Sequence, residues 1–436
     1  MSNTHAKPVE TAVHPAAPQF SSTYLTYVMI LLAIVNVFNF MDRTVISVLM
    51  PAIKAELKFS DTELGLLSGL AFAVFYASVG IPIAAFADRT IRRNIVATAL
   101  VMWSGMTALC GFAQNFLQLF LARVGVGVGE AGCLPPSHSL IGDYFKAEQR
   151  SSALAIHTAG SSVGVMAGLM IGGILVKEFG WRETFIILGL PGIVLAAIVM
   201  LTLKEPPRGA SDVVRSVARE GEPRTLIELI RKRPSYLQLI MVFGGGGFVA
   251  FGLQQWLPSF YTRSYDMPIA DVGLIYGGIT GVAATVGAVV GGFIGDRLMR
   301  RGPFLVLYYS ALCYLLAFGF KFAMLLSGTA QQSLIFNFFS SLTAIGSHGA
   351  VFALVQAVTP HHLRSRAAAL LTFFTALIGT GAGPLFIGWV SDLYFPVFGN
   401  ESLRYGLLWC SGLALWPLLH LWLARRWIKA DMALTS

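Results

Sequence analysis

The 436-residue chain is 55% hydrophobic and only 12% charged, with a mean hydropathy of +0.68 and a formal net charge of +9. Soluble domains carry about 25% charged residues, so a soluble globular protein could not bury this much apolar surface. The positive charge does not indicate nucleic-acid binding, because it lies in short connections and not on a broad water-facing surface. The composition therefore excludes a soluble enzyme and predicts an integral membrane protein with no nucleic-acid partner.

Apolar stretches long enough to cross a bilayer as helices recur along the chain, separated by charges, prolines and turn residues. They predict an all-α integral membrane protein with twelve transmembrane helices, in two pseudo-symmetric six-helix bundles around a central cavity. The predicted helices cover 23–50, 61–87, 92–114, 116–140, 151–176, 182–204, 236–263, 271–297, 303–327, 329–358, 366–396 and 402–428. The corresponding domains are an N-terminal tail over 1–22, bundles over 23–204 and 236–428, a linker over 205–235 and a C-terminal tail over 429–436.

Basic residues predict the orientation of these helices. Most of the 31 Lys and Arg residues lie in or beside the even-numbered connections, the linker and the two tails. Because cytoplasmic loops carry an excess of Lys and Arg, we expect both termini and the linker to be cytoplasmic. Residues 1–22 lack a basic segment followed by an apolar one, so they predict a cytoplasmic tail and no cleaved signal. The compact loops favour a bacterial inner membrane.

Two kinds of site are not indicated. The four cysteines lie inside apolar segments without paired spacing, so neither a disulfide framework nor a metal site is predicted. No Gly-Lys dipeptide occurs, which excludes a Walker A loop and ATP hydrolysis by this chain. We therefore expect no cofactor and a proton gradient as the driving force.

A charged motif with the spacing D-R-x-x-R-R occurs after the second and after the eighth predicted helix, at matching places of the two halves. Its residues are Asp88, Arg89, Arg92 and Arg93 in the first copy, and Asp296, Arg297, Arg300 and Arg301 in the second. The aspartates can pair with nearby arginines and cap a neighbouring helix, which predicts a conformational latch that holds the two halves in an outward-open state. The alternative is that these charges only set the topology, although that role would not repeat the aspartate.

Four charges lie well inside predicted helices: Asp42, Arg43, Arg123 and Glu130. Each costs about 2.5 to 3.5 kcal/mol at a helix centre, which favours mutual pairing in a wet cavity. Counting along the helices places Asp42 and Arg123 at the same depth, so this pair is expected. We hypothesise that Asp42 and Glu130 bind protons while Arg43 and Arg123 tune them; the alternative is a static network of buried ion pairs.

These motifs carry a family resemblance. The two D-R-x-x-R-R loops, the Arg123–Glu130 segment and the turn Gly180-Trp181-Arg182 resemble the major facilitator superfamily over essentially the whole chain. Within it, Phe40-Met41-Asp42-Arg43 and Arg123-Val-Gly-Val-Gly-Val-Gly-Glu130-Ala resemble the spinster branch, whose members export lysophospholipids and sphingosine phosphates. The resemblance also implies that a glycine stripe in the fifth helix, at 160, 164, 168 and 172, faces the eighth helix.

The second half offers polar and aromatic side chains where the first half offers charges. The predicted substrate cavity uses Gln254, Gln255, Trp256, Tyr261, Asn337, Ser341, His348, Phe373 and Phe374. A cavity that is charged on one side and apolar-aromatic on the other suits a solute with a polar head and an oily tail. Lys321 lies near the outer end of the ninth helix, from which its side chain can reach the membrane surface, and no role is predicted for it.

Together these features predict a secondary active transporter that works by alternating access and moves an amphipathic, lysophospholipid-like or sphingolipid-like solute with protons. The expected partners are this solute, protons and membrane lipids, and the chain is expected to be a monomer. Two alternatives within transporters are a proton symporter of a small organic anion, bound by Arg43 or Arg123, and a multidrug exporter. A membrane lipid enzyme or a channel would not explain the repeated loops.

Overall fold

The computed structural model describes residues 20–87, 89–207 and 222–434, and within these ranges the chain forms helices and no strands. The first half contains α1 (Ser22–Leu57), α2 (Asp61–Gly65), η1 (Leu66–Leu70), α3 (Ala71–Ala87), α4 (Arg92–Cys110), α5 (Phe116–Ala131), α6 (Leu134–Tyr144), α7 (Ala147–Phe179) and α8 (Trp181–Thr202). The second half contains α10 (Pro234–Tyr265), α11 (Ile269–Asp271), η2 (Val272–Tyr276), α12 (Gly277–Met299), α13 (Pro303–Leu325), α14 (Ala330–Ala357), η3 (His361–Leu363), α15 (Arg364–Phe374), η4 (Thr375–Ala382), α16 (Gly383–Phe398), η5 (Gly399–Glu401), α17 (Ser402–Gly412) and α18 (Leu415–Ala424). Short helices α9 (Leu226–Lys232) and α19 (Ile428–Ala433) lie outside these two sets.

Ten segments of the described chain are long and apolar enough to cross a membrane. One of them, Arg366–Ala424, contains two crossings separated by η5, and α4 adds a twelfth. A crossing interrupted by a short element counts as one, such as α2–η1–α3, whose elements follow one another without a gap. The predicted all-α fold with twelve transmembrane helices is confirmed.

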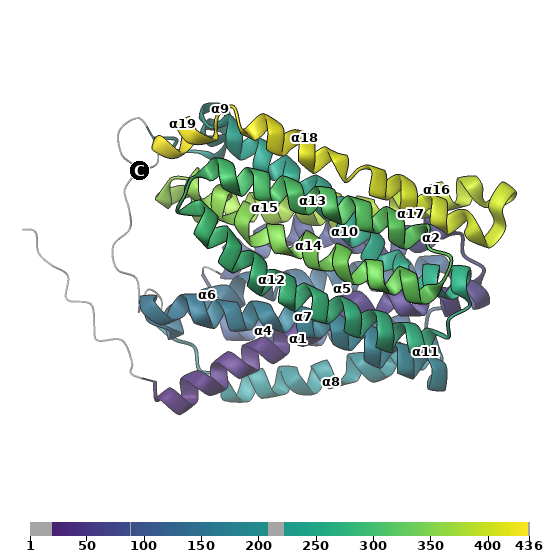
Figure 1. Cartoon of the computed structure of the whole chain (residues 1–436). Helices are drawn as coiled ribbons and strands as arrows, with labels where there is room; N and C mark the ends of the chain where they lie inside the picture. The colour runs from purple at the N-terminus through teal and green to yellow at the C-terminus, as the bar shows by residue number, and fades with distance from the viewer. Residues whose placement is uncertain (1–19, 88, 208–221, 435–436) are drawn as a thin grey trace, which may run out of the picture.

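The two ends of the bundle differ in the connections that they hold. We call the end with α2, α11 and η5 the outer face, and the end with α9 and α19 the inner face, following the predicted orientation (Figure 1). At the outer face, polar side chains start the helices: Ser60 forms a capping box with Glu63, and Asn115 and Thr329 accept backbone N–H groups of the first helical turn. Such caps satisfy donors that the helix itself cannot.

Equivalent arginines fasten equivalent helices in the two halves at the outer face. Arg182, at the start of α8, donates to the carbonyl oxygen of Ala113 at 2.9 Å, just beyond the end of α4. Arg404, at the start of α17, donates to the carbonyl oxygen of Leu325 at 3.0 Å, at the end of α13. An arginine that satisfies a helix C-terminus therefore occurs at the same place in both halves, which supports an internal duplication.

The inner face repeats this relation between neighbouring helices. Arg150 in α7 donates to the carbonyl oxygen of Gly142 at 2.8 Å, and Arg364 at the start of α15 donates to that of Thr359 at 3.4 Å. Both bonds join the helix that starts at the inner face to the helix that ends there. The repeat is thus structural as well as sequential.

The linker is fastened at both ends. On the side of the first half, Arg92 binds Glu205 and the carbonyl oxygen of Pro206. On the side of the second half, the His362 ring lies 2.8 Å from the carbonyl oxygen of Pro223. Residues 208–221 of the predicted linker lie outside the described residues, and α9 occupies its later part.

The glycine stripe of α7 packs against α1, and not against the eighth crossing as the family resemblance implied. Cβ atoms built at these glycines would press on the backbone or side chains of α1, with Ala33, Val37, Met41 and Val45 as the nearest residues to positions 160, 164, 168 and 172. Since the Cβ-free stripe lets two helices approach closely, it joins neighbours within the first half. The eighth crossing instead meets α7 through other residues, with Gly173 opposite Gly273.

Gly164→Ala tests this packing. A methyl group there would overlap the Val37 carbonyl oxygen and lie 2.9 Å from Phe40 Cβ, so overpacking should cost about 1–3 kcal/mol of stability and lower the melting temperature in detergent. Gly105→Ala in α4 is the matched control, because its Cβ would meet nothing within 4 Å and alanine is the better helix former. Equal melting temperatures for the two variants would contradict the tight α1–α7 contact.

Candidate functional site

The two halves touch most closely near the outer face, where glycines permit backbone contact. A Cβ at Gly65 in α2 would lie 2.5 Å from the carbonyl oxygen of Pro384 in α16, and one at Gly388 would overlap that of Asp61. By contrast, Gly292 at the inner end of α12 faces open space. Because backbones of opposite halves meet at the outer side, this side is sealed in the present conformation.

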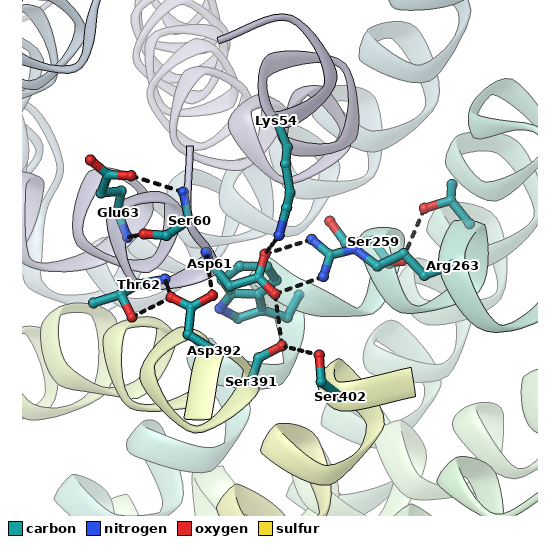
Figure 2. A network of polar contacts seen from close by, with 12 residues as sticks. Lys54, Ser60, Asp61, Thr62, Glu63, Ser259, Arg263, Ser391, Asp392 and Ser402 are labelled. Atoms are coloured by element: carbon teal, nitrogen blue, oxygen red, sulfur yellow. Dashed lines mark hydrogen bonds and ion pairs between the residues drawn. The ribbon is translucent and has the colours of Figure 1, made fainter. Parts of the chain in front are cut away.

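A network of charges centred on Asp61 reinforces this seal (Figure 2). The fully buried Asp61 carboxylate receives two bonds of 2.7 Å from the Arg263 guanidinium of α10, one of 2.5 Å from Lys54 of α1 and one of 2.7 Å from Ser391 of α16. A bidentate arginine–carboxylate pair is among the stronger polar contacts in proteins. Three helices from both halves thus converge on the first residue of α2.

Asp392 contributes the second acid of this network and also caps α2 from the opposite half. Its carboxylate accepts the backbone N–H of Asp61 at 3.0 Å and of Thr62 at 2.7 Å, together with the Thr62 hydroxyl at 2.6 Å. A carboxylate at a helix N-terminus is favoured by the unpaired N–H groups and by the helix dipole. Separation of the halves at the outer face would break this cap and the Asp61–Arg263 pair together.

The first D-R-x-x-R-R loop makes contacts within its own half. Arg92 is buried and binds Asp143 at the end of α6 and, at 2.7 Å, Glu205. Arg93 donates to the carbonyl oxygen of Leu203 at 3.2 Å. Asp88 lies outside the described residues, and Arg89 is exposed. In this conformation the motif arginines therefore hold α4, α6 and the start of the linker together.

The second copy of the motif is not engaged. The side chains of Asp296, Arg297, Arg300 and Arg301 are exposed and have no ion pair or hydrogen bond among the described residues. In the second copy, the predicted latch therefore makes no contact between the halves among the described residues, and its role in an outward-open state stays a prediction. The polar contact that joins the halves in this conformation lies at the other end of the molecule.

Of the four charges inside the first half, Arg43 and Glu130 form the ion pair. Arg43 Nη2 lies 2.6 Å and Nε 3.1 Å from Glu130 Oε2, and Nη2 also donates to Asn39 at 3.3 Å. The guanidinium lies over the rings of Phe40, Phe72 and Tyr76 at 4.5–4.9 Å, so its faces contact aromatic π-systems while its edge binds the carboxylate. The Arg43 side chain is 15% exposed, whereas Glu130 is fully buried.

The expected pair between Asp42 and Arg123 does not form at ion-pair distance. Asp42 accepts a bond of 3.3 Å from the Thr107 hydroxyl, and among the described residues no ion pair joins it to Arg123. Among the described residues, Asp42 Oδ1, Glu130 Oε1 and all three Arg123 nitrogens lack hydrogen-bond partners, although all three side chains are buried. Agreement in depth did not settle which side chains face each other, because successive residues of a helix point about 100° apart.

A cavity of about 230 Å³ lies between the halves, and we call it the central cavity. The first half lines it with Phe40, Ser161, Ser162 and Val165, and the second half supplies most of the remaining wall. The predicted residues Gln254, Asn337 and Ser341 are in this wall. Asn337 donates to the Thr280 hydroxyl at 3.0 Å, which orients its amide within the wall.

The other predicted cavity residues lie elsewhere. Gln255 points away from Gln254 and donates to the Ser68 carbonyl oxygen of the first half at 3.2 Å. Trp256 and Tyr261 are fully buried; the indole N–H donates to the Pro384 carbonyl oxygen at 2.8 Å, and the phenol accepts the Ser333 hydroxyl. These three residues therefore belong to the sealed outer packing. His348, which packs edge-on against Phe243, and the partly buried Phe373 and Phe374 also lie outside the lining of the central cavity.

Sequence reasoning missed two groups of residues. Lys321, to which no role was assigned, lines the central cavity. The Asp61 network was not recognised, because its members lie at helix ends, where charges are usually solvated. A signal was present: Asp61 and Asp392 are acidic residues beside apolar helix segments near the face predicted to be outside, where few basic residues occur.

The residues of this site offer no metal-binding chemistry. In the described part of the chain, no group of three or more His, Cys, Asp or Glu side chains could hold an ion. The polar groups instead form ion pairs between helices and donors around a cavity, an arrangement typical of proteins that bind a solute between two moving bundles.

Comparison with known proteins decides the family. The model of the Major Facilitator Superfamily matches residues 32–384. The chain belongs to the major facilitator superfamily. Its twelve crossings and paired loops are those of this family, and both the family and the structural neighbours point to a transporter rather than an enzyme, embedded in a membrane by many helices.

Individual relatives cover between 64% and 94% of the chain. An "MFS-type efflux pump" of Mycolicibacterium smegmatis is 33% identical, over 92% of each chain. A "probable L-galactonate transporter" of Escherichia coli is 29% identical, over 64% of this chain and 63% of the relative. The crystal structure of a bacterial homolog to the human lysosomal transporter Spinster, in an inward-facing and occupied conformation, superimposes with a TM-score of 0.85 at 28% identity, covering 94% of this chain and 99% of that one. The resemblance to the spinster branch is thereby confirmed.

Asp61→Asn tests the outer seal. The variant leaves the positive groups of Lys54 and Arg263 facing each other without their carboxylate, so the population that is open at the outer face should rise at least about tenfold, equivalent to about 1.4 kcal/mol. Spin labels at Phe112 and Leu326, exposed outer positions of opposite halves, report this as a shift to longer electron–electron distances. Asp266→Asn is the matched control, because Asp266 is exposed at the same face. Identical distance distributions for both variants would show that the Asp61 network does not hold the halves together.

Proposed function

We propose that this chain is a proton-coupled secondary transporter that works by alternating access and moves an amphipathic organic solute of the lysophospholipid or sphingolipid type. The observation that carries the proposal is the Arg43–Glu130 ion pair, which lies beside Asp42 between the membrane faces and next to the central cavity wall at Phe40. Opposite charges in lipid are expensive to keep, so a functional use explains them better than stability alone.

Proton coupling is supported by the unequal partners of the two acids. Glu130 holds Arg43 through one oxygen only, and each acid has one buried carboxylate oxygen without a hydrogen-bond partner among the described residues. Protonation of Glu130 would weaken its hold on Arg43, and the guanidinium would then keep Asn39, its other hydrogen-bond partner, as its acceptor. An arginine whose pairing changes in this way links the proton affinity of each acid to the conformation of the first half.

Alternating access is supported by the position of the seal. The halves meet at the outer face, while the second repeat loop at the inner face is exposed and unpaired. Rocking about the central cavity would separate Asp61 from Arg263 and Asp392 and bring the D-R-x-x-R-R loops into contact. The two sets of charges would thus stabilise opposite states.

An amphipathic solute suits the composition of the cavity wall. Polar groups of Gln254, Asn337 and Ser341 lie beside Leu253, Leu257 and Met324, so one wall can solvate a head group while the rest accepts an apolar chain. The name of the Escherichia coli relative supports a second candidate, a proton symporter of a sugar acid. We further propose that the protein acts as a monomer in a bacterial inner membrane, with both termini cytoplasmic.

Asp42→Asn and Glu130→Gln test the coupling in proteoliposomes loaded with lysophospholipid, sphingosine phosphate or galactonate. For each coupled proton, a gradient of one pH unit supports about a tenfold solute ratio, equivalent to about 1.4 kcal/mol. We expect the wild-type protein to build this ratio for at least one solute and each variant to build none, while exchange without a gradient continues.

Two results would contradict the proposal. One is gradient-driven transport by both variants at the level of the control Asp266→Asn, which removes an exposed carboxylate. The other is transport of none of the three solutes by the wild-type protein. Recovery of a transported solute in a chemically altered form would instead favour a membrane enzyme.

A further inference from the structure

Charges in the interior of the bundle balance each other in sets. Asp42 and Glu130 oppose Arg43 and Arg123 in the first half. At the outer seal, Asp61 and Asp392 oppose Lys54 and Arg263. Each set sums to zero, as expected where an unbalanced charge costs several kcal/mol.

Lys321 has no such balance. It lies in α13, four residues before the end of the helix, and has no ion pair or hydrogen bond among the described residues. Lys321 is therefore a cation in the wall of the central cavity that no acidic side chain opposes among the described residues.

The position of this charge indicates what balances it. Lys321 is the one charged residue in the wall of the central cavity, and all residues of that wall are described. No acidic side chain lies in the wall, so nothing there repels an anion. The side chains of Gln254 and Ser341 share the cavity with Lys321 and have no hydrogen-bond partner among the described residues. A cation with neighbouring amide and hydroxyl donors is the chemistry that binds an oxyanion.

We propose that Lys321 binds an anionic oxyacid group of the transported solute, a carboxylate or a phosphate, at the end of the central cavity nearest the outer seal, with Gln254 and Ser341 as hydrogen-bonding partners. The inference rests on the proposed function and specifies the substrate class of the same cavity. Lys321 lies in the second half, so it would attach the solute to that bundle. The ion pair of Arg43 and Glu130 lies in the first half.

The helix that carries Lys321 is held in place at its outer end. Met324, one turn beyond Lys321, lines the same cavity and is almost fully buried, and the end of its helix is fastened by Arg404 through Leu325. An anion on Lys321 therefore binds against a part of the second half that packing holds rigid. A rigid support keeps the ammonium group in place, which favours specific binding.

The test measures binding to the purified full-length chain in detergent, with no pH gradient. The probes are two anions from different sources, lysophosphatidic acid and galactonate, and their uncharged counterparts, monoacylglycerol and galactose. We expect Lys321→Gln to weaken binding of the anionic probe at least about tenfold and to leave binding of its uncharged counterpart unchanged, while Lys321→Arg stays within a few-fold of the wild type. Lys177→Gln, at an exposed outer helix end, is the matched control and should match the wild type.

The ligand-free melting temperature gives a second readout. Lys321→Gln removes an unbalanced charge, so the ligand-free variant should melt at the same or a higher temperature than the wild type, and the anionic probe should stabilise it less. Binding of lysophosphatidic acid assigns the anion to a lipid head group, and binding of galactonate assigns it to a free acid; both support the proposal.

Three outcomes overturn it: equal affinity of Lys321→Gln and the wild type for the anions, equal loss of charged and uncharged probes, or no anion binding by the wild type. Because no gradient is involved, these outcomes are distinct from a failure of proton coupling.

Discussion

An ionic side chain inside a bilayer is stabilised by an opposite charge or a polar ligand close to it, and two such pairs organise much of the interior of the protein. They join Arg43 to Glu130 within the first half and Arg263 to Asp61 across the two halves. The two pairs differ in consequence. A pair within one bundle can stay intact while the bundles move, whereas a pair between bundles has to break before they separate. The location of each pair relative to the boundary therefore decides whether it has to break when the halves separate.

The outer seal combines close packing of glycine backbones with a network of charged side chains. Glycine backbones at Gly65 and Gly388 fit only when the halves are in register, since a single added carbon would clash. The Asp61 network adds directional polar bonds that join the first turn of α2 to α16. Together the two kinds of contact define the relative position of the halves in this conformation. A hydrophobic cluster with members from both halves packs around them.

Much of the fold was predictable from the sequence because lipid leaves a chain few choices. Every backbone polar group in the bilayer must be bonded within a helix, so apolar runs predicted the twelve crossings, and the repeated loops predicted the two halves.

Which side chains and helices face each other was not predictable in the same way. Asp42 and Arg123 lie at matching depth, yet the neighbouring Arg43 faces the acid of α5. The glycines of α7 predicted a close helix contact correctly, but their partner is α1. Lys321 could reach either the surface or the cavity, since a lysine one turn from a helix end can extend both ways.

The fastening of the linker at Glu205 and Pro206 on one bundle and at Pro223 on the other has a mechanical consequence. Only the stretch of about 16 residues between these two anchors can act as a tether between the bundles. A fully extended chain of this length spans roughly 50 Å. The contour length of this stretch limits how far the two bundles can separate. The linker therefore keeps the two bundles close together when the outer seal has broken, because they cannot diffuse apart in the membrane. Each closure of the seal is then a first-order event whose rate does not depend on protein concentration.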